Sequence, residues 1–426
     1  MNTSSSPAKA FGTEPSGNDF PAPPLPRPRG SGPSSMHPLR GLLERLLRGL
    51  ACGTLSVQLP GGERIEGRGA EPGPHAALTL HRWRPLLRLM LQGDLGMAES
   101  YRDGDWSTPD LVELLEFGSR NEAGWGRVLE GSWAARCTGR LFGLLRANTR
   151  RGSRRNIAYH YDISNAFYAQ WLDPQLIYSS ALYANGDESL ELAQEQKLAR
   201  IVELLAPPPQ ASVLEIGCGW GALALRLAGR HGARLTGLTL SNEQLAHARE
   251  QVSAQGLDHA VDLRLQDYRD VQGQYDRIVS IEMLEAVGEH YWPLYFQTLR
   301  DRLKAGGSGV LQVITIDDAY FERYRASTDF VQRFIFPGGK LPSVQAMKAE
   351  AERAGLRLEQ ALSFGDSYAS TLAEWRRRFT AAWPAIAEMG FDASFRRLWE
   401  YYLCYCEAGF RTGRVDVGLF TFRHAN

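Results

Sequence analysis

The segment SVLEIGCGWG, residues 212–221, decides the fold, because an apolar strand runs directly into a glycine-rich turn. Residues 212–216 have the length and apolar character of a buried strand, and residues 222–230 continue as a helix. Glycines in the turn let the backbone adopt positive φ and approach a ligand closely. A strand, such a turn and a helix in this order are typical of the first unit of a parallel α/β sheet.

The same alternation of strand and helix continues downstream. We expect further strands over 234–240, 261–265, 275–280 and 309–314, with helices over 241–255 and up to residue 303. Short connections of this kind join parallel strands through crossover helices. The sequence therefore predicts an α/β fold in which helices cover both faces of a parallel sheet.

The glycine turn has a ligand-binding pattern. Gly217, Gly219 and Gly221 are spaced GxGxG, and Glu215 precedes them at the end of the strand. This pattern resembles the S-adenosylmethionine loop of seven-strand methyltransferases more than it resembles a dinucleotide fingerprint. Glu215 fits that interpretation because its carboxylate can meet the positive end of the co-substrate. The alternative is a glycine-rich turn that binds no ligand.

Two further strand ends supply candidate contacts to the same co-substrate. The second strand ends in Thr239 and Leu240, with no acid for ribose hydroxyls, so Gln244 is the candidate neutral acceptor. Asp267 and Tyr268 end the third strand, where the edge and face of an adenine are usually met. Asp267 has an alternative role as a helix cap.

The first part of the chain lacks this regular alternation of strands and helices. Residues 1–35 contain 8 Pro, 7 Ser and 4 Gly, a composition that predicts a disordered tail. Leucines at helical spacing over 39–50, with Pro38 at the start, predict a helix. Alternating apolar residues predict strands around 55–59 and 78–80, and residues 83–91 read as a buried helix.

Thr108-Pro109-Asp110 resembles an N-cap, an N1 proline and a first-turn acid, opening a helix that continues through Glu116. We therefore expect residues 36–145 to form a small α+β domain without a residue cluster of obvious chemistry. Residues 146–155 would follow as a basic linker, and residues 156–426 as the main domain.

Composition excludes several classes of protein. Lys plus Arg and Asp plus Glu both number 48, and this balance argues against a nucleic-acid partner. The five cysteines are scattered and odd in number, so neither a disulfide framework nor a paired zinc or other metal site is expected. No apolar run is long enough to span a bilayer, and no signal peptide opens the chain. We expect a cytoplasmic protein.

Charge is unevenly distributed along the chain. Residues 1–155 contain 21 Lys and Arg against 15 Asp and Glu. Much of this excess lies in one run: Arg146, Arg150, Arg151, Arg154 and Arg155. Such a run can contact anionic lipid head groups at the inner face of a membrane. The alternative is a solvated linker between domains.

Several segments together resemble the cyclopropane-fatty-acyl-phospholipid synthase family, which includes the mycolic-acid cyclopropane synthases. The resemblance spans residues 156–426 and is carried by AYHYDISN (158–165), WLD (171–173), YSSA (178–181), LEIGCGWG (214–221), GLTLS (237–241), FIFPGGKLPS (334–343) and FR (410–411). It implies a seven-strand, Rossmann-like methyltransferase domain preceded by the small α+β domain. It also implies that Tyr178 and Ser179 contact S-adenosylmethionine.

The resemblance implies methyl transfer to a cis double bond in the acyl chain of a membrane phospholipid. An isolated alkene is a weak nucleophile, but a sulfonium methyl is a strong electrophile. Methyl transfer leaves a carbocation, and a base must then remove a proton to close the ring. The site must exclude water, and aromatic faces can stabilise the cation at about 1–2 kcal/mol each.

In this family a bound bicarbonate ion serves as the base. The resemblance assigns its ligands to Glu285, the Ile314 backbone and Tyr368, with Ser180 in place of a cysteine and Gln312 in place of a histidine. Ser and Gln can hydrogen-bond an oxyanion, but neither adds positive charge. A base placed differently could take another proton and leave a methylene branch. An oxidoreductase partner would then produce a methyl branch.

Other residues carry two interpretations each. Cys406 matches a cysteine sometimes assigned as catalytic, but the mechanism needs no thiolate and a packing role is favoured. Tyr402 and Phe410 either line an acyl channel or belong to the core. Glu282, three residues before Glu285 on one helix face, either orients the site or is a solvated acid. His160, with Tyr161, either covers the co-substrate or is a buried structural histidine.

Three functions remain at this stage. The first is a cyclopropane-forming enzyme, the second a methylene- or methyl-branching relative, and the third a lipid-binding protein without catalysis. The small α+β domain is expected to present the catalytic domain to the bilayer. The sequence allows a homodimer but does not require one.

Overall fold

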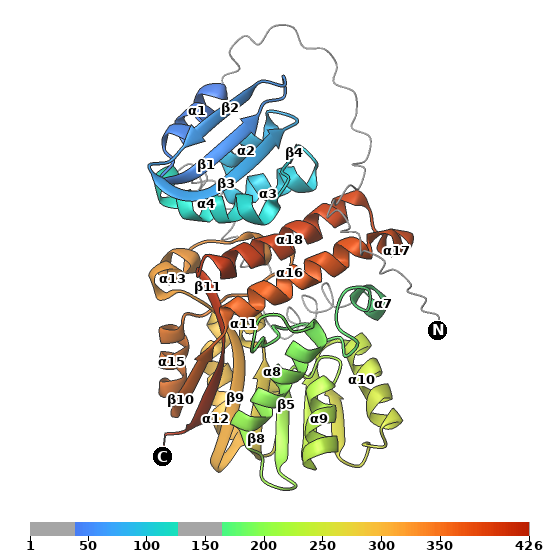
Figure 1. Cartoon of the computed structure of the whole chain (residues 1–426). Helices are drawn as coiled ribbons and strands as arrows, with labels where there is room; N and C mark the ends of the chain where they lie inside the picture. The colour runs from blue at the N-terminus through green and yellow to red at the C-terminus, as the bar shows by residue number, and fades with distance from the viewer. Residues whose placement is uncertain (1–38, 127–163, 426) are drawn as a thin grey trace, which may run out of the picture. The chain divides into compact units, whose positions relative to one another are not determined.

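The computed structural model describes residues 39–126 and 164–425 (Figure 1). The predicted tail (1–35), the basic linker (146–155), and the segment with His160 and Tyr161 lie outside the described residues.

A four-stranded sheet is built from the first described segment. Its strands are β1 (Cys52–Gln58), β2 (Arg64–Arg68), β3 (Glu71–Leu80) and β4 (Trp106–Ser107), and its helices are α1 (Arg40–Arg48), α2 (Arg84–Gln92), α3 (Asp94–Arg102) and α4 (Leu111–Trp125). The strand order is β2-β1-β3-β4, with β1 and β3 parallel. Leucines of α1 are buried at helical spacing, as expected. The limits of an independent N-terminal domain stay a prediction.

The predicted start of α4 was wrong. Asp110, rather than Thr108, is the N-cap, because its backbone is extended and its side chain accepts a hydrogen bond from the Glu113 N–H at 3.0 Å. The Thr108 hydroxyl instead donates to the Asp110 carbonyl. The helix also continues well beyond Glu116, to Trp125.

The prediction that residues 83–91 form a buried helix was wrong in part. Leu86 and Leu89 of α2 are buried, but Leu87, Met90 and Leu91 are 45%, 36% and 52% exposed. The exposed residues are spaced i, i+3 and i+4, so they share one face of the helix. The helix therefore has an apolar face toward solvent as well as one toward the core.

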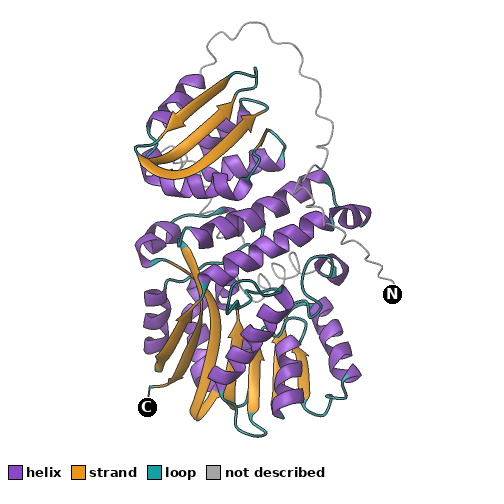
Figure 2. Cartoon of the chain, in the orientation of Figure 1, coloured by secondary structure: helices purple, strands orange, loops and turns teal. Residues whose placement is uncertain are grey.

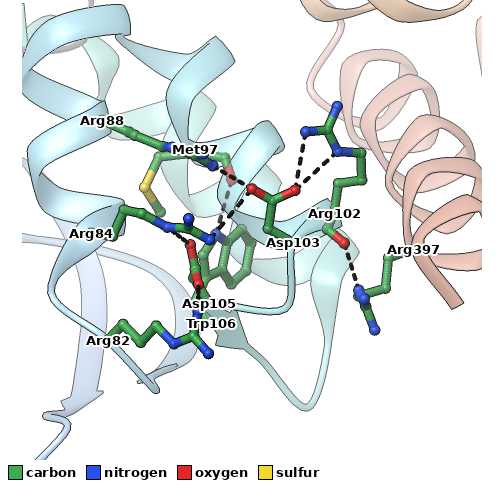
Figure 3. A network of polar contacts seen from close by, with 9 residues as sticks. All are labelled: Arg82, Arg84, Arg88, Met97, Arg102, Asp103, Asp105, Trp106 and Arg397. Atoms are coloured by element: carbon green, nitrogen blue, oxygen red, sulfur yellow. Dashed lines mark hydrogen bonds and ion pairs between the residues drawn. The ribbon is translucent and has the colours of Figure 1, made fainter.

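Two carboxylates beside this helix are held by arginines (Figure 3). Asp105 is fully buried and pairs with Arg84 at 2.5 Å and with Arg82 at 3.3 Å. Asp103 pairs with Arg88 at 2.8 Å. A buried carboxylate requires such partners, so we interpret this network as structural.

The second, larger sheet has seven strands: β5 (Ser212–Ile216), β6 (Arg234–Thr239), β7 (Val261–Leu265), β8 (Tyr275–Ile281), β9 (Leu303–Ile316), β10 (Leu356–Ser363) and β11 (Val415–His424). The order is β10-β11-β9-β8-β5-β6-β7. Strands β5 to β9 are parallel, as predicted, whereas β11 is antiparallel to both β9 and β10. The predicted seven-strand α/β fold is confirmed.

Helices cover both faces of this sheet (Figure 2). The longer helices of this part of the chain are α8 (Leu190–Leu205), α9 (Ala222–His231), α10 (Asn242–Ala254), α12 (Trp292–Arg302), α15 (Val344–Arg353), α16 (Gly365–Ala381) and α18 (Ala393–Arg411). The shorter ones are α7 (Asn165–Tyr168), α11 (Leu284–Val287), α13 (Asp318–Arg325), α14 (Phe330–Phe334), α17 (Trp383–Glu388), and the 3-10 turns η2 (Tyr268–Asp270) and η3 (Glu289–Tyr291). Val213 packs in one core cluster and its neighbour Leu214 in the other, as expected for a strand buried on both faces.

Helices α16 and α18 lie side by side beyond the carboxyl ends of the parallel strands (Figure 1). Helix α18 also contacts α3 and α4 of the smaller sheet. Arg397 on α18 donates to the Arg102 carbonyl at 2.8 Å (Figure 3). The Tyr101 hydroxyl donates to Glu400 at 3.1 Å. One long helix thus contacts both the seven-stranded sheet, at β11, and the helices of the first described segment.

Candidate active site

The glycine turn lies at the carboxyl end of β5, next to β8, where the order of the parallel strands reverses. Gly217, Gly219 and Gly221 all have positive φ, at 86°, 51° and 94°. A side chain on Gly217 would come within 2.7 Å of the Met283 side chain. One on Gly219 would meet no described atom within 4 Å. At Gly219 the turn therefore presents bare backbone to open space, as close approach of a ligand requires.

Glu215 lies directly before this turn and is buried, with 2% of its surface exposed. Its Oε2 atom has no hydrogen-bond partner among the described residues. Burial raises the pKa of Glu215 to about 8, although the charge of Lys197 opposes the shift. A cationic group bound here would satisfy the carboxylate, so S-adenosylmethionine fits this side chain.

Lys197, on α8, is a buried residue that the sequence analysis missed. Its Nζ donates to the Ser179 hydroxyl at 2.8 Å, and burial lowers its pKa to about 8. The charges of Glu282, Asp173 and Glu215, in that order, act against this lowering. The available signal was its place in the helix, since it falls on the stripe of buried apolar residues of α8.

The remaining residues predicted to contact the co-substrate lie at the ends of β6 and β7. The Thr239 hydroxyl donates to the Gln244 side-chain oxygen at 2.9 Å, next to Leu240. Asp267 caps the 3-10 turn that follows it and pairs with Arg269 at 2.6 Å. The alternative role of Asp267 as a cap is thus observed, and its role toward adenine, with the buried Tyr268, stays a prediction.

Glu282 is the central side chain of a second cluster, at the end of β8. Its Oε1 accepts hydrogen bonds from the Ser180 backbone N–H and from Gln312 Nε2, both at 2.8 Å. Its Oε2 accepts one from the Tyr368 hydroxyl, also at 2.8 Å. The prediction that Glu282 shares a helix face with Glu285 was wrong, because α11 begins only at Leu284. Its alternative role as a solvated acid is excluded by these bonds.

Glu285 has a different environment. Its Oε1 accepts a hydrogen bond from the Ile314 backbone N–H, while its Oε2 is shielded from solvent and has no partner among the described residues. Burial, followed by the negative charge of Glu282, raises the pKa of Glu285 to about 8. Glu282 also has a raised pKa because of burial, but hydrogen bonds and the charge of Lys197 counteract the shift.

Bicarbonate does not fit this arrangement. The resemblance assigned five ligands to the ion, and the structure does bring these five residues together around one centre. Their donors, however, are used by the protein itself. Ser180, Gln312 and Tyr368 bind the carboxylate of Glu282, and Ile314 binds that of Glu285. The Ser180 hydroxyl donates to the Ala181 carbonyl.

Aromatic rings enclose the same centre. The hydroxyls of Tyr178 and Tyr402 are 2.9 Å apart, and the Tyr178 ring lies 5.3 Å from that of Trp375. The rings of Tyr368 and Phe410 are 4.5 Å apart. The structure thus places Tyr402 and Phe410 near the predicted site, whereas their contact with an acyl chain stays a prediction.

Cys406 does not have the properties of a reactive thiol. Burial is the main cause that raises its pKa, with Asp329 and Glu282 adding to the effect. The thiol is therefore protonated at neutral pH, which favours the packing role. In residues 39–126 and 164–425, no group of His, Cys, Asp and Glu side chains could hold a metal ion. Across the same ranges, no helix is both long and apolar enough to cross a bilayer.

Comparison with known proteins extends these observations. Residues 148–420 match the family model described as mycolic acid cyclopropane synthetase. The chain is 39% identical to tuberculostearic acid methyltransferase UfaA1 of Mycobacterium tuberculosis, in a match covering 89% of this chain and 90% of the relative. It is 36% identical to cyclopropane-fatty-acyl-phospholipid synthase of Escherichia coli K12, over 79% and 84% of the two chains.

A solved structure shows the same similarity in three dimensions. Mycolic acid cyclopropane synthase CmaA1, complexed with SAH and CTAB, superimposes with a TM-score of 0.59 and 29% sequence identity. The match covers 63% of this chain and 97% of that one.

Proposed function

Because the chain belongs to the mycolic acid cyclopropane synthetase family of S-adenosylmethionine-dependent methyltransferases, we propose that it methylates a cis double bond in a phospholipid acyl chain and closes a cyclopropane ring. The relatives named above act on lipids, as their names state.

One observation carries the proposal. Met283 lies between Glu282 and Glu285 in the sequence, and its side chain occupies the space that a side chain on Gly217 would need. The glycine turn therefore packs against the segment that carries the two carboxylates. A methyl donor held at the turn would be next to a group able to take a proton.

The chemistry matches the residues around this contact. The double bond attacks the sulfonium methyl, and the cation that forms needs a dry environment with electron-rich surfaces. The Tyr178, Trp375 and Tyr368 rings supply such surfaces, each worth about 1–2 kcal/mol when desolvated. No protein nucleophile is needed, in agreement with a protonated Cys406.

Similarity to one of these relatives favours a second possible product. The chain aligns over most of its length with a tuberculostearic acid methyltransferase, whose name states a different product from a cyclopropane synthase. On this alternative, the same methyl transfer ends in a methylene branch, which an oxidoreductase partner reduces. Ser180 and Gln312, which replace the cysteine and histidine that the resemblance leads us to expect, are compatible with either product.

We also propose that the enzyme works as a peripheral protein on the inner face of a membrane. The substrate is a bilayer lipid, so the active site must reach it from the surface. The exposed apolar face of α2, consisting of Leu87, Met90 and Leu91, can insert among lipid head groups. The arginine-rich segment 146–155 adds attraction to anionic lipids on this proposal.

The test is incubation of the full-length protein with S-adenosylmethionine and vesicles of a cis-monounsaturated phospholipid, followed by proton NMR of the released fatty acids. Upfield ring protons support the cyclopropane product, and vinylidene protons support the methylene product. Product mass does not separate the two, because both gain CH₂. Binding of S-adenosylmethionine with no modified lipid, across several unsaturated phospholipids, would instead indicate a lipid-binding protein without catalysis.

A further inference from the structure

We propose that the carboxylate of Glu282 is the general base of the reaction and takes the place that the family resemblance gives to bicarbonate. This inference rests on the proposed function, since it concerns the base for the same methyl transfer. Its support is the hydrogen-bond geometry at the end of β8.

The donors that would hold a small oxyanion hold Glu282. The Ser180 N–H, Gln312 Nε2 and the Tyr368 hydroxyl all lie 2.8 Å from its two oxygens. A carboxylate and a bicarbonate ion present the same pair of oxygens to such donors. The side chain thus supplies from within the chain the group that would otherwise come from solution.

The backbone of Glu282 adopts a strained conformation at this position. Its φ is 49°, in the left-handed region that non-glycine residues seldom adopt. Such a conformation is strained, and it persists because the surroundings fix it. The three side-chain hydrogen bonds and the bond from the Glu282 N–H to the Gln312 carbonyl provide that fixation. Strain of this kind is typical of functional sites.

The two neighbouring carboxyls divide the roles of acid and base. Glu282 has three donors and the nearby charge of Lys197, which counteract the raising of its pKa by burial, so its carboxylate is the better stabilised of the two. Glu285 has one backbone donor and faces the charge of Glu282, so it is the one that keeps its proton. Two carboxyls this close do not both ionise readily.

The step balances without any further reactant. The π electrons of the double bond form a carbon–carbon bond to the sulfonium methyl, and the carbon–sulfur bond breaks to release S-adenosylhomocysteine. The cation then loses one proton from the new methyl to the Glu282 carboxylate. The electron pair of that carbon–hydrogen bond closes the ring, and Glu282 ends the step protonated.

The experiment compares the full-length wild type with Glu282→Gln and Glu282→Gly, in carbon dioxide-free buffer and with added sodium bicarbonate. Gln keeps the shape and can still accept hydrogen bonds, whereas Gly suits the positive φ and opens the space. Glu289→Gln is the matched control, because Glu289 lies in the same segment but pairs with Arg325 instead. The readouts are kcat, the KM for S-adenosylmethionine, and a titration of ¹³C-bicarbonate followed by NMR.

We expect wild-type turnover to be unaffected by the removal of bicarbonate. Glu282→Gln should lose about 100-fold or more in kcat with little change in KM, as expected when a general base is removed. Glu282→Gly should be inactive in depleted buffer and regain activity with bicarbonate, and only this variant should bind the labelled ion. The control should behave as the wild type.

Two outcomes would overturn the inference: wild-type activity that disappears without bicarbonate and returns with it, or a Glu282→Gln variant with wild-type kcat. Failure of the proposed function would look different, since the wild type would then modify no lipid in either buffer. In that case the ¹³C titration still tests whether Glu282 fills the bicarbonate site. Binding of labelled bicarbonate to the wild type would show that it does not.

Discussion

Glu215 illustrates how a single buried carboxylate can favour ligand binding at the expense of stability. Its raised pKa, about 8, means that the folded protein binds this proton more tightly than the unfolded chain does. The stability that this proton provides is present at low pH and is lost as pH rises from the ordinary glutamate pKa toward 8. Without ligand, the ionised side chain has no hydrogen-bond partner for Oε2 among the described residues.

We therefore predict that Glu215→Gln raises the Tm of the ligand-free protein relative to wild type, more at pH 8 than at pH 5. The same change should weaken binding of S-adenosylmethionine at least about tenfold, since a charge-assisted contact is lost. Thermal scans at the two pH values and calorimetric titration measure both effects. A gain in Tm that is equal at both pH values, or unchanged affinity, would contradict this role.

Substitution of Gly219 tests whether the glycine turn binds S-adenosylmethionine. Gly219→Ala should abolish detectable binding of S-adenosylmethionine, because the new methyl group enters the space in front of the turn. Gly232→Ala is the matched control, since Gly232 also has positive φ, at 63°, and also faces open space, but at the far end of α9. Both changes should cost about 1 kcal/mol of stability from backbone strain. Equal loss of binding in both variants would refute a specific role for Gly219.

At the level of single elements, α2 has an exposed apolar face that the fold does not require. We predict that Leu87→Asp combined with Leu91→Asp reduces binding to anionic phospholipid vesicles at least about tenfold, because two side chains no longer insert. Leu294→Asp, on α12, is the control, since Leu294 is also exposed, at 40%. Vesicle co-sedimentation measures the binding. Equal binding of all variants would show that α2 does not contact the membrane.

The sequence predicts elements well where local signals and burial agree. The strand over 261–265 has those limits in the structure, and Ser241 caps α10 where the helix was expected to begin. The start of α4 was misplaced, because Thr108 and Asp110 are both good caps and only the backbone conformation decides between them. The antiparallel strands β10 and β11 follow the region of regular alternation, so periodicity gave no topology for them.

The residues of the candidate site could be predicted from the sequence, but their hydrogen-bonding arrangement could not. Ser180, Glu285, Gln312, Ile314 and Tyr368 do converge, as the family resemblance implied. That their donors bind Glu282 depends on the positive φ of this residue, which no sequence pattern reveals. Lys197 was missed because a lysine within a helix is normally exposed.

At the scale of the whole molecule, the seven-stranded sheet explains why these parts meet. The turn after β5, the glutamates after β8, and Gln312 and Ile314 on β9 all lie at the ends of adjacent strands, at the point where the strand order reverses. Helices α16 and α18 add the aromatic side chains above this edge. Methyl donor, base and lipid are thereby expected at one place.

The most direct test of this account is the fate of the transferred carbon. The full-length protein is incubated with S-adenosylmethionine labelled with ¹³C in its methyl group and with vesicles of a cis-monounsaturated phospholipid, and the extracted lipid is examined by ¹³C NMR. We predict that the label appears in the acyl chain, as a ring carbon at the former double bond. Label that stays in S-adenosylmethionine, although calorimetry shows the co-substrate bound, would contradict the proposed function.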